Sequence, residues 1–230
     1  MTNPAAYQGG PEGSFARRGH GGHAAPPPPH VGFHPVIDLE TGTVVAVSAP
    51  APAGRVTDLE SDIDRAILAA HATSQRETLL PLHVALRAAT LADDRGMDRL
   101  HQTFTSMGRR PSGVIISVGG LFGGMPPQEA VARLGRLRAT GYLIAIEHAA
   151  DLPARFVAEV APSVLALDPE LARRASADPR RAALVDALVS LGRRTGGHVL
   201  APGVVDDEQL VRLRGLGVRL AQGPLLAAPD

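Results

Sequence analysis

The sequence predicts an α/β fold, namely a (β/α) TIM-like barrel that begins with an antiparallel hairpin. Short apolar runs recur eight times along the chain, and several are apolar at every position, which is typical of parallel strands buried on both faces. Amphipathic stretches with helical spacing separate the later runs. A doubly wound open sheet is the alternative architecture. The expected strands span residues 35–39, 44–47, 80–86, 114–118, 142–146, 164–167, 198–201 and 218–221.

The first two runs are expected to pair with each other. The connection Glu40-Thr41-Gly42 between them has the length of a β-hairpin loop, and strands joined by such a loop run antiparallel. The barrel should therefore depart from an all-parallel arrangement at its first strand.

Four helices are expected from start signals followed by apolar residues at helical spacing. In the second helix, Glu129 and Arg133 also form an i,i+4 charge pair. The predicted starts are Thr57 with Glu60, Pro126 with Pro127, Asp178 with Pro179, and Asp206 with Asp207. The predicted inward faces are Leu59, Ile63, Ile67 and Leu68; Val131, Leu134 and Leu137; Leu184, Leu188 and Leu191; and Leu210 and Leu213.

Residues 1–31 are predicted to be a disordered Gly/Pro/His-rich tail, and residues 32–230 to form one barrel domain. The tail has few large apolar side chains and contains four consecutive prolines, so it cannot bury enough surface to offset the entropy of ordering. Its three histidines, His20, His23 and His30, have no rigid surroundings to fix a ligand geometry. No metal site is expected there.

Composition excludes several classes of function. The 23 basic and 23 acidic residues give a formal net charge of zero, so no nucleic-acid partner is expected. No apolar run has transmembrane length and no signal-peptide pattern opens the chain, so we expect a soluble, cytoplasmic protein without a membrane partner. The chain contains no lysine and no cysteine, and its one asparagine is Asn3. Lysine and thiolate chemistry are therefore excluded.

Several segments resemble, in order, parts of the EAL domain, the barrel phosphodiesterase of cyclic di-GMP. Residues 33–42 (FHPVIDLETG) resemble its opening strand and turn, and residues 198–205 (HVLAPGVV) resemble a strand followed by Ala-Glu-Gly-Val-Glu. Residues 207–210 (DEQL) and 222–226 (QGPLL) resemble its closing helix and Gln-Gly motif. The resemblance covers residues 33–229 and implies a barrel of the EAL type.

This resemblance implies a reaction whose required residues are largely replaced here. Members of the family hold two divalent cations with acidic and amide ligands, activate a water for attack on a phosphodiester, and place a lysine near that water. The matching positions hold Ser48 for the glutamate of the Glu-Ala-Leu signature, Pro52 for an arginine, Ala85 for an asparagine, Ile116 and Gly119 for a pair of glutamates, Ala166 for the lysine, and Pro202 and Val205 for two further glutamates.

Four polar residues remain at matching positions and are the candidates for a ligand pocket. They are Glu147 and His148 at a paired-aspartate motif, Asp168 at a Lys-Ile-Asp motif, and Gln222. Two carboxylates are too few for a two-metal site, so these departures imply no catalytic residue, no metal and no cofactor.

Asp168, and two histidines outside this set of four, have structural interpretations. Asp168 directly precedes Pro169, which is the pattern of a helix N-cap. His34 and His83 lie on apolar strands and are expected to be hydrogen-bonded core or rim residues.

Three functions are compatible with this residue set. The leading hypothesis is a catalytically inactive EAL-like domain, not an enzyme, that acts in bacterial signalling as a regulatory module with a protein partner. The alternative is a receptor that binds cyclic di-GMP or another nucleotide without cutting it, which Gln222 and the arginine content favour. The least favoured is an enzyme, either a residual phosphodiesterase or new acid–base or metal chemistry at Glu147, His148 and Asp168.

Overall fold

The computed structural model describes residues 32–49, 59–75, 79–119, 124–175 and 177–227. The predicted tail, residues 1–31, and the predicted helix cap at Thr57 lie outside these ranges. Among the helices of the described part, none combines the length and apolar character that crossing a membrane requires.

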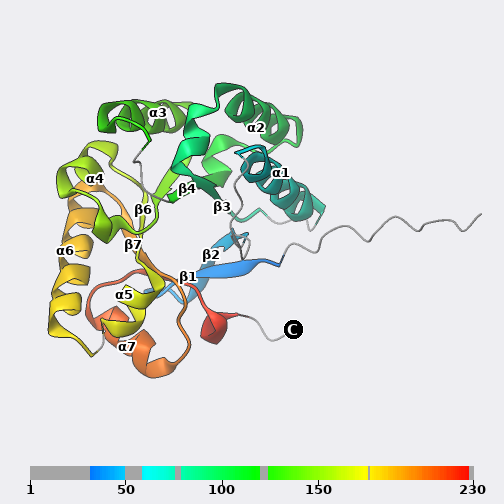
Figure 1. The fold of residues 1–230 in the computed structure, drawn as a ribbon. Coiled ribbons are helices and arrows are strands. Elements are labelled where there is room, and N and C mark those ends of the chain that lie inside the picture. The colour runs from blue at the N-terminus through cyan, green and yellow to red at the C-terminus, as the bar shows by residue number, and fades with distance from the viewer. Residues whose placement is uncertain (1–31, 50–58, 76–78, 120–123, 176, 228–230) are drawn as a thin grey trace, which may run out of the picture. The chain divides into compact units, whose positions relative to one another are not determined.

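Eight strands close into a barrel in chain order, which confirms the predicted architecture and excludes the open sheet (Figure 1). β1 runs antiparallel to both of its neighbours, β2 and β8, and every other neighbouring pair is parallel. The predicted hairpin is thus also confirmed. The strands are β1 His34–Asp38, β2 Thr43–Ser48, β3 Leu82–Arg87, β4 Val114–Gly119, β5 Leu143–Ile146, β6 Val164–Ala166, β7 His198–Ala201 and β8 Leu220–Ala221.

Helices lie around the outside of the barrel (Figure 1). α2 was not among the four predicted helices, because it is rich in polar residues and only Leu100 and Phe104 of its side chains are fully buried. The described helices are α1 Leu59–Gln75, α2 Asp94–Ser106, α3 Pro127–Thr140, α4 Ala154–Val160, α5 Pro169–Arg174, α6 Pro179–Thr195 and α7 Asp207–Gly215.

Aspartate side chains cap the starts of four of these helices, and Asp93 caps α2 by accepting a hydrogen bond from the Gly96 backbone N–H. Asp178 accepts a hydrogen bond from the Arg180 backbone N–H, and Asp206 accepts one from that of Gln209, as the sequence predicts. Asp168 caps α5 in the same way. At the other end of α6, Gly196 takes a left-handed conformation with φ 78°, which stops the helix before β7.

The inward faces of the helices are narrower than predicted. Ile63, Leu134, Leu188, Leu191 and Leu213 are buried as expected. The predictions for Leu68 and Leu184 are wrong, because these side chains are 44% and 40% exposed. Small residues explain the first error. Ala66, Ala69 and Ala70 are buried and bring α1 close to the barrel, and Leu68 is left on the outside of the helix. On α6 the buried row passes through Val185 and Val189 instead of Leu184.

The apolar core has two layers that follow the alternation of side chains along each strand. One layer fills the barrel interior and includes Val36, Ile115 and Leu200. The other lies between the barrel and its helices and includes Ile116 and Leu165. Every second side chain of a strand faces the barrel interior. Polar residues at these positions near the strand ends therefore point into the mouth of the barrel.

Candidate functional site

A cavity of about 300 Å³ opens where the parallel strands end, and we call it the C-terminal pocket. This end of a (β/α) barrel is where barrel enzymes place their chemistry. The lining includes three of the four predicted residues, Glu147, His148 and Gln222. Its other polar residues are His34, Ser48, His83 and Ser117.

Glu147 follows β5 and is held against β4. Its backbone N–H donates to the Val118 carbonyl at 3.0 Å, and its Oε1 accepts a hydrogen bond from the Ser117 hydroxyl at 2.9 Å. A Cβ placed on Gly119 would lie 2.2 Å from Glu147 Oε2, so the carboxylate occupies the space that a side chain at position 119 would need. Glycine at 119 and serine at 117 therefore fix this carboxylate in the mouth of the barrel.

His148 and Asp168 form a pair beside Glu147. His148 Nδ1 lies 3.2 Å from Asp168 Oδ2, across the ends of β5 and β6. The other oxygen of Asp168 accepts hydrogen bonds from the backbone N–H groups of Glu170 at 2.8 Å and Leu171 at 3.1 Å. The predicted N-cap is thus confirmed, and this carboxylate is already committed to the start of α5.

His148 also has a left-handed backbone, with φ 51° and ψ 41°. This conformation is uncommon for a residue other than glycine and costs on the order of 1 kcal/mol or more. It redirects the chain from β5 into the short 3₁₀ turn Ala149–Asp151, and places the imidazole over Asp168. The pairing between His148 and Asp168 was not predicted, because it depends on this turn.

Gln222 follows β8 and has an unusual side chain. Its Oε1 atom is buried and has no hydrogen-bond partner among the described residues. Its backbone is fixed by two hydrogen bonds to the neighbouring strand end, from its N–H to Ala201 O and from Val204 N–H to its carbonyl, both 3.0 Å. Gln222 therefore has a fixed backbone, and it contributes a polar side chain to the pocket wall.

His83 lies deep in the same pocket and is 6% exposed. Burial lowers the pKa of its imidazole to about 4, so the ring is neutral at pH 7. The predicted burial is confirmed. No hydrogen bond joins its ring to another described residue, which differs from the expectation of a hydrogen-bonded histidine. His34, as expected of a rim residue, is exposed.

One position assigned by resemblance needs correction. Ile116 is fully buried in the outer layer that faces the helices, so its side chain points away from the C-terminal pocket. Ser117, the next residue along β4, points into it. The period-two alternation of a strand, applied to the one polar residue in this apolar run, would have identified Ser117.

The side chains present do not fit a pair of divalent cations. The strand ends present Ser48, Ala85 and Pro202 to the pocket, and none of these carries a charged oxygen. Glu147 is hydrogen-bonded to Ser117, while Asp168 caps α5. In the described part of the chain, no group of three or more His, Asp or Glu side chains is placed to hold a metal ion. The described charged oxygens of this pocket are thus too few for a site with two cations.

Comparisons with known proteins agree with this fold. The family model described as EAL domain matches residues 35–229. The cyclic di-GMP phosphodiesterase RocR of Pseudomonas aeruginosa is 32% identical over 108 residues, which cover 45% of this chain and 27% of RocR. The chain therefore matches about a quarter of the length of that relative.

Two solved structures show the same barrel. The PaMucR phosphodiesterase in complex with c-di-GMP superposes with a TM-score of 0.75 at 20% identity, covering 87% of this chain and 91% of that one. The BlrP1 structure from Klebsiella pneumoniae with manganese and cyclic di-GMP has a TM-score of 0.75 at 22% identity, covering 88% of this chain and 57% of that one. At these identities the likeness establishes the fold.

Proposed function

This chain belongs to the EAL domain family, and from that premise we propose that it is a catalytically inactive, cytoplasmic member that regulates signalling through contact with a protein partner. One observation carries the proposal: the C-terminal pocket, where a barrel enzyme keeps its reactive groups, presents Ser48, Ala85 and Pro202 at strand ends. A domain that has this fold but lacks the reactive groups is suited to binding a protein partner.

The scarcity of metal-coordinating side chains near the pocket is the reason why we expect no hydrolysis of cyclic di-GMP. Cleavage of a phosphodiester between two cations needs carboxylates that bridge and orient both metals. The two carboxylates near the pocket, those of Glu147 and Asp168, are engaged with Ser117 and with the first turn of α5. The whole chain also lacks the lysine that the family places beside the attacking water.

The charge of the pocket also argues against cyclic di-GMP as a ligand. Its described lining contains no arginine to pair with the two phosphates, and Glu147 adds a negative charge. The volume of about 300 Å³ lies at the lower end of the range for small-molecule pockets, about 300–1,000 Å³. A free dianionic nucleotide would therefore meet repulsion without compensating contacts.

A non-hydrolysing nucleotide receptor is the second candidate, and Gln222 is the observation that favours it. The buried, unpartnered Oε1 of Gln222 is an acceptor that lacks a donor among the described residues. An N–H group of a nucleobase would satisfy it, and an unsatisfied buried acceptor costs about 1–3 kcal/mol.

An exposed valine supports protein contact at this end of the barrel. Val205 follows β7, and its side chain is 55% exposed at a position where the resemblance implies a glutamate. Its backbone is held by a hydrogen bond from its N–H to Gln209 Oε1 at 3.0 Å. This exposed apolar side chain on the rim is the position at which we propose that the partner contacts this end of the barrel.

A charge substitution at this valine tests the proposal. We expect a partner to co-purify in stoichiometric amount with the full chain at native expression level, and V205R to lose it because an arginine there would be buried without a counter-charge. V44R is the matched control, because Val44 is also an exposed valine, 40% exposed, at the start of β2. Retention of the partner by V205R, or recovery of no stoichiometric partner, would contradict the proposal.

A further inference from the structure

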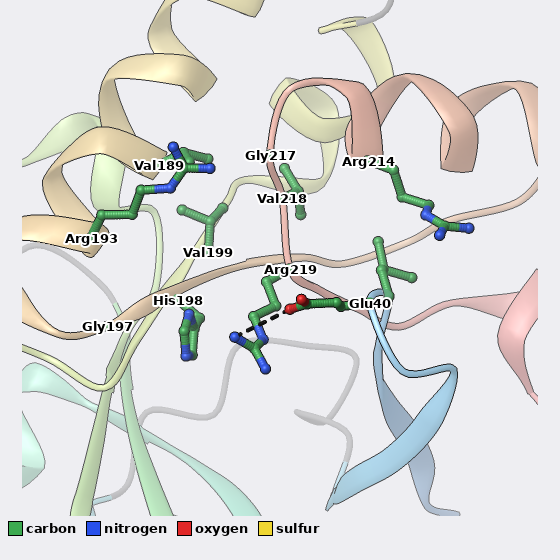
Figure 2. Close-up of a pocket in the computed structure, with 11 residues that line it drawn as sticks. Glu40, Val189, Arg193, Gly197, His198, Val199, Arg214, Gly217, Val218 and Arg219 are labelled. Carbon is green, nitrogen blue, oxygen red and sulfur yellow. Dashed lines mark ion pairs between the residues drawn. The ribbon is translucent and has the colours of Figure 1, made fainter.

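A second cavity, of about 360 Å³, lies at the opposite end of the barrel, and we call it the N-terminal pocket (Figure 2). It forms where the chain enters β7 and β8, beside the turn that follows the antiparallel strand β1. Four of its lining residues are apolar and make a floor: Leu39, Val189, Val199 and Val218. Neither the proposed function nor the family chemistry uses this end.

The rim of the N-terminal pocket is basic. Arg193 extends from α6, Arg214 from the last turn of α7, and Arg219 from the segment that leads into β8 (Figure 2). His198 completes this rim, and Glu40 is its one carboxylate. Three arginines and one carboxylate thus line the rim, and Figure 2 shows Arg193 and Arg214 on opposite sides of the floor.

Arg219 is the arginine that is already paired. Its Nε donates to Asp38 Oδ2 at 3.0 Å, and its Nη1 lies 3.4 Å from Glu40 Oε2, the ion pair drawn in Figure 2. These contacts hold the guanidinium in place at the pocket edge. Arg193 and Arg214 form no ion pair with the described residues, so both charges are available to a ligand.

Arg193 lies against the loop before β8. Gly217 has φ 81°, and a Cβ there would lie 3.1 Å from Arg193 Nη2 and 3.2 Å from a methyl group of Val189. The guanidinium therefore rests against the backbone of this loop, next to the apolar floor.

The pocket also affects the histidine on its rim. Partial burial lowers the pKa of His198, and the positive charge of Arg219 lowers it further, while Asp38 and Glu40 act in the opposite direction. The net lowering arises first from burial, which opposes a charge of either sign, and only in part from Arg219.

We propose that the N-terminal pocket binds a small organic phosphate, a phosphate monoester with an apolar body. Guanidinium groups bind phosphate oxygens through paired, charge-assisted hydrogen bonds, and Arg193, which lies beside Val189 of the floor, supplies such a group. The apolar body of the ligand contacts the valines of the floor. The pocket volume lies within the range for small-molecule sites.

Phenyl phosphate is the minimal probe of this proposal, because it joins a dianion to an apolar ring. In titration calorimetry with the full chain, we expect phenyl phosphate to bind more tightly than inorganic phosphate, and phenol to give no heat. R193Q should weaken phenyl phosphate about tenfold, the effect of losing one charged hydrogen bond.

A control variant distinguishes binding in the N-terminal pocket from attraction by the general positive charge at the end of α6. Basic residues are common in the last turn of a helix because they complement its dipole. Arg194 is the neighbour of Arg193 in α6, is exposed and does not line the pocket, so R194Q should leave the affinity within about twofold. Absence of phenyl phosphate binding, equal affinity for inorganic phosphate, or equal weakening by R194Q would overturn the proposal.

Discussion

Replacing Asp62 by alanine is expected to lower the free energy of unfolding by about 3 kcal/mol. Asp62 lies in α1 with 0% of its surface exposed, and its Oδ2 accepts hydrogen bonds from Arg87 Nε at 2.8 Å and Thr90 Oγ1 at 2.6 Å. The same oxygen accepts from the Arg87 backbone N–H at 3.1 Å. One carboxylate thus joins α1 to the end of β3 and to the following 3₁₀ turn.

The size of the effect follows from what the substitution leaves behind. Thr90 is fully buried, so its hydroxyl would lose its partner without reaching water. The Arg87 side chain is 34% exposed and would be partly rehydrated, which places the cost at the lower end of the range for breaking a buried pair.

D64A is the matched control for D62A in urea unfolding. Asp64 lies on the same helix, and its pair with Arg99 at 2.6 Å joins side chains that are both half exposed, 57% and 50%. Such a pair contributes about 1 kcal/mol or less. If D62A lost no more stability than D64A, the assignment of Asp62 as a structural link would be wrong.

His83 makes the protein less stable as the pH falls from 7 to 5, by about 2 kcal/mol. Burial lowers the pKa of its imidazole from 6.5 to about 4 in the folded state. Between these two values the unfolded chain binds a proton that the folded chain does not, so acidification favours unfolding. The Asp62 carboxyl titrates below this window, because its unfolded pKa is 3.8 and its folded pKa is lower still, the cost of burial being outweighed by its hydrogen bonds from Arg87 and Thr90.

Comparison of wild type with H83F measures this contribution. The substitution keeps an aromatic ring of similar size and removes the titration, so the loss of stability between pH 7 and pH 5 should shrink by about 2 kcal/mol. The lowered pKa of His198, caused first by partial burial, contributes to both proteins and cancels in the comparison. H34F, which removes an exposed ring, should retain the wild-type pH dependence. Equal pH dependence of H83F and wild type would show that His83 titrates normally.

The barrel was predictable because its strands are short apolar runs with little ambiguity. Parallel strands covered by helices are apolar at nearly every position, and β4 and β5 are recognisable on that ground alone. Helix faces were less predictable, since the orientation of a helix about its own axis is set by packing. Leu184 satisfies helical spacing as well as Val185 does, and the structure buries the valine.

The polar candidates predicted for the C-terminal pocket lie just after strands. Glu147 and Gln222 directly follow a strand, His148 comes one residue later, and all three line the cavity. Ser117 and His83 were missed as pocket residues because they lie inside apolar strands, where a single polar residue gives no signal without the direction of its side chain. The N-terminal pocket was not predictable, because it brings Glu40 together with arginines that follow it by more than 150 residues.

The central claim is that this EAL domain does not hydrolyse cyclic di-GMP, and titration calorimetry with recovery of the nucleotide tests it most directly. Purified full chain is titrated with cyclic di-GMP with and without Mn²⁺, and the nucleotide is then examined by chromatography, with RocR treated in parallel to show that the assay detects cleavage. We predict no heat of binding and intact nucleotide under both conditions. Binding of intact nucleotide without metal would establish the receptor instead of the protein-interaction module, whereas linear product that forms only with Mn²⁺ would contradict the central claim.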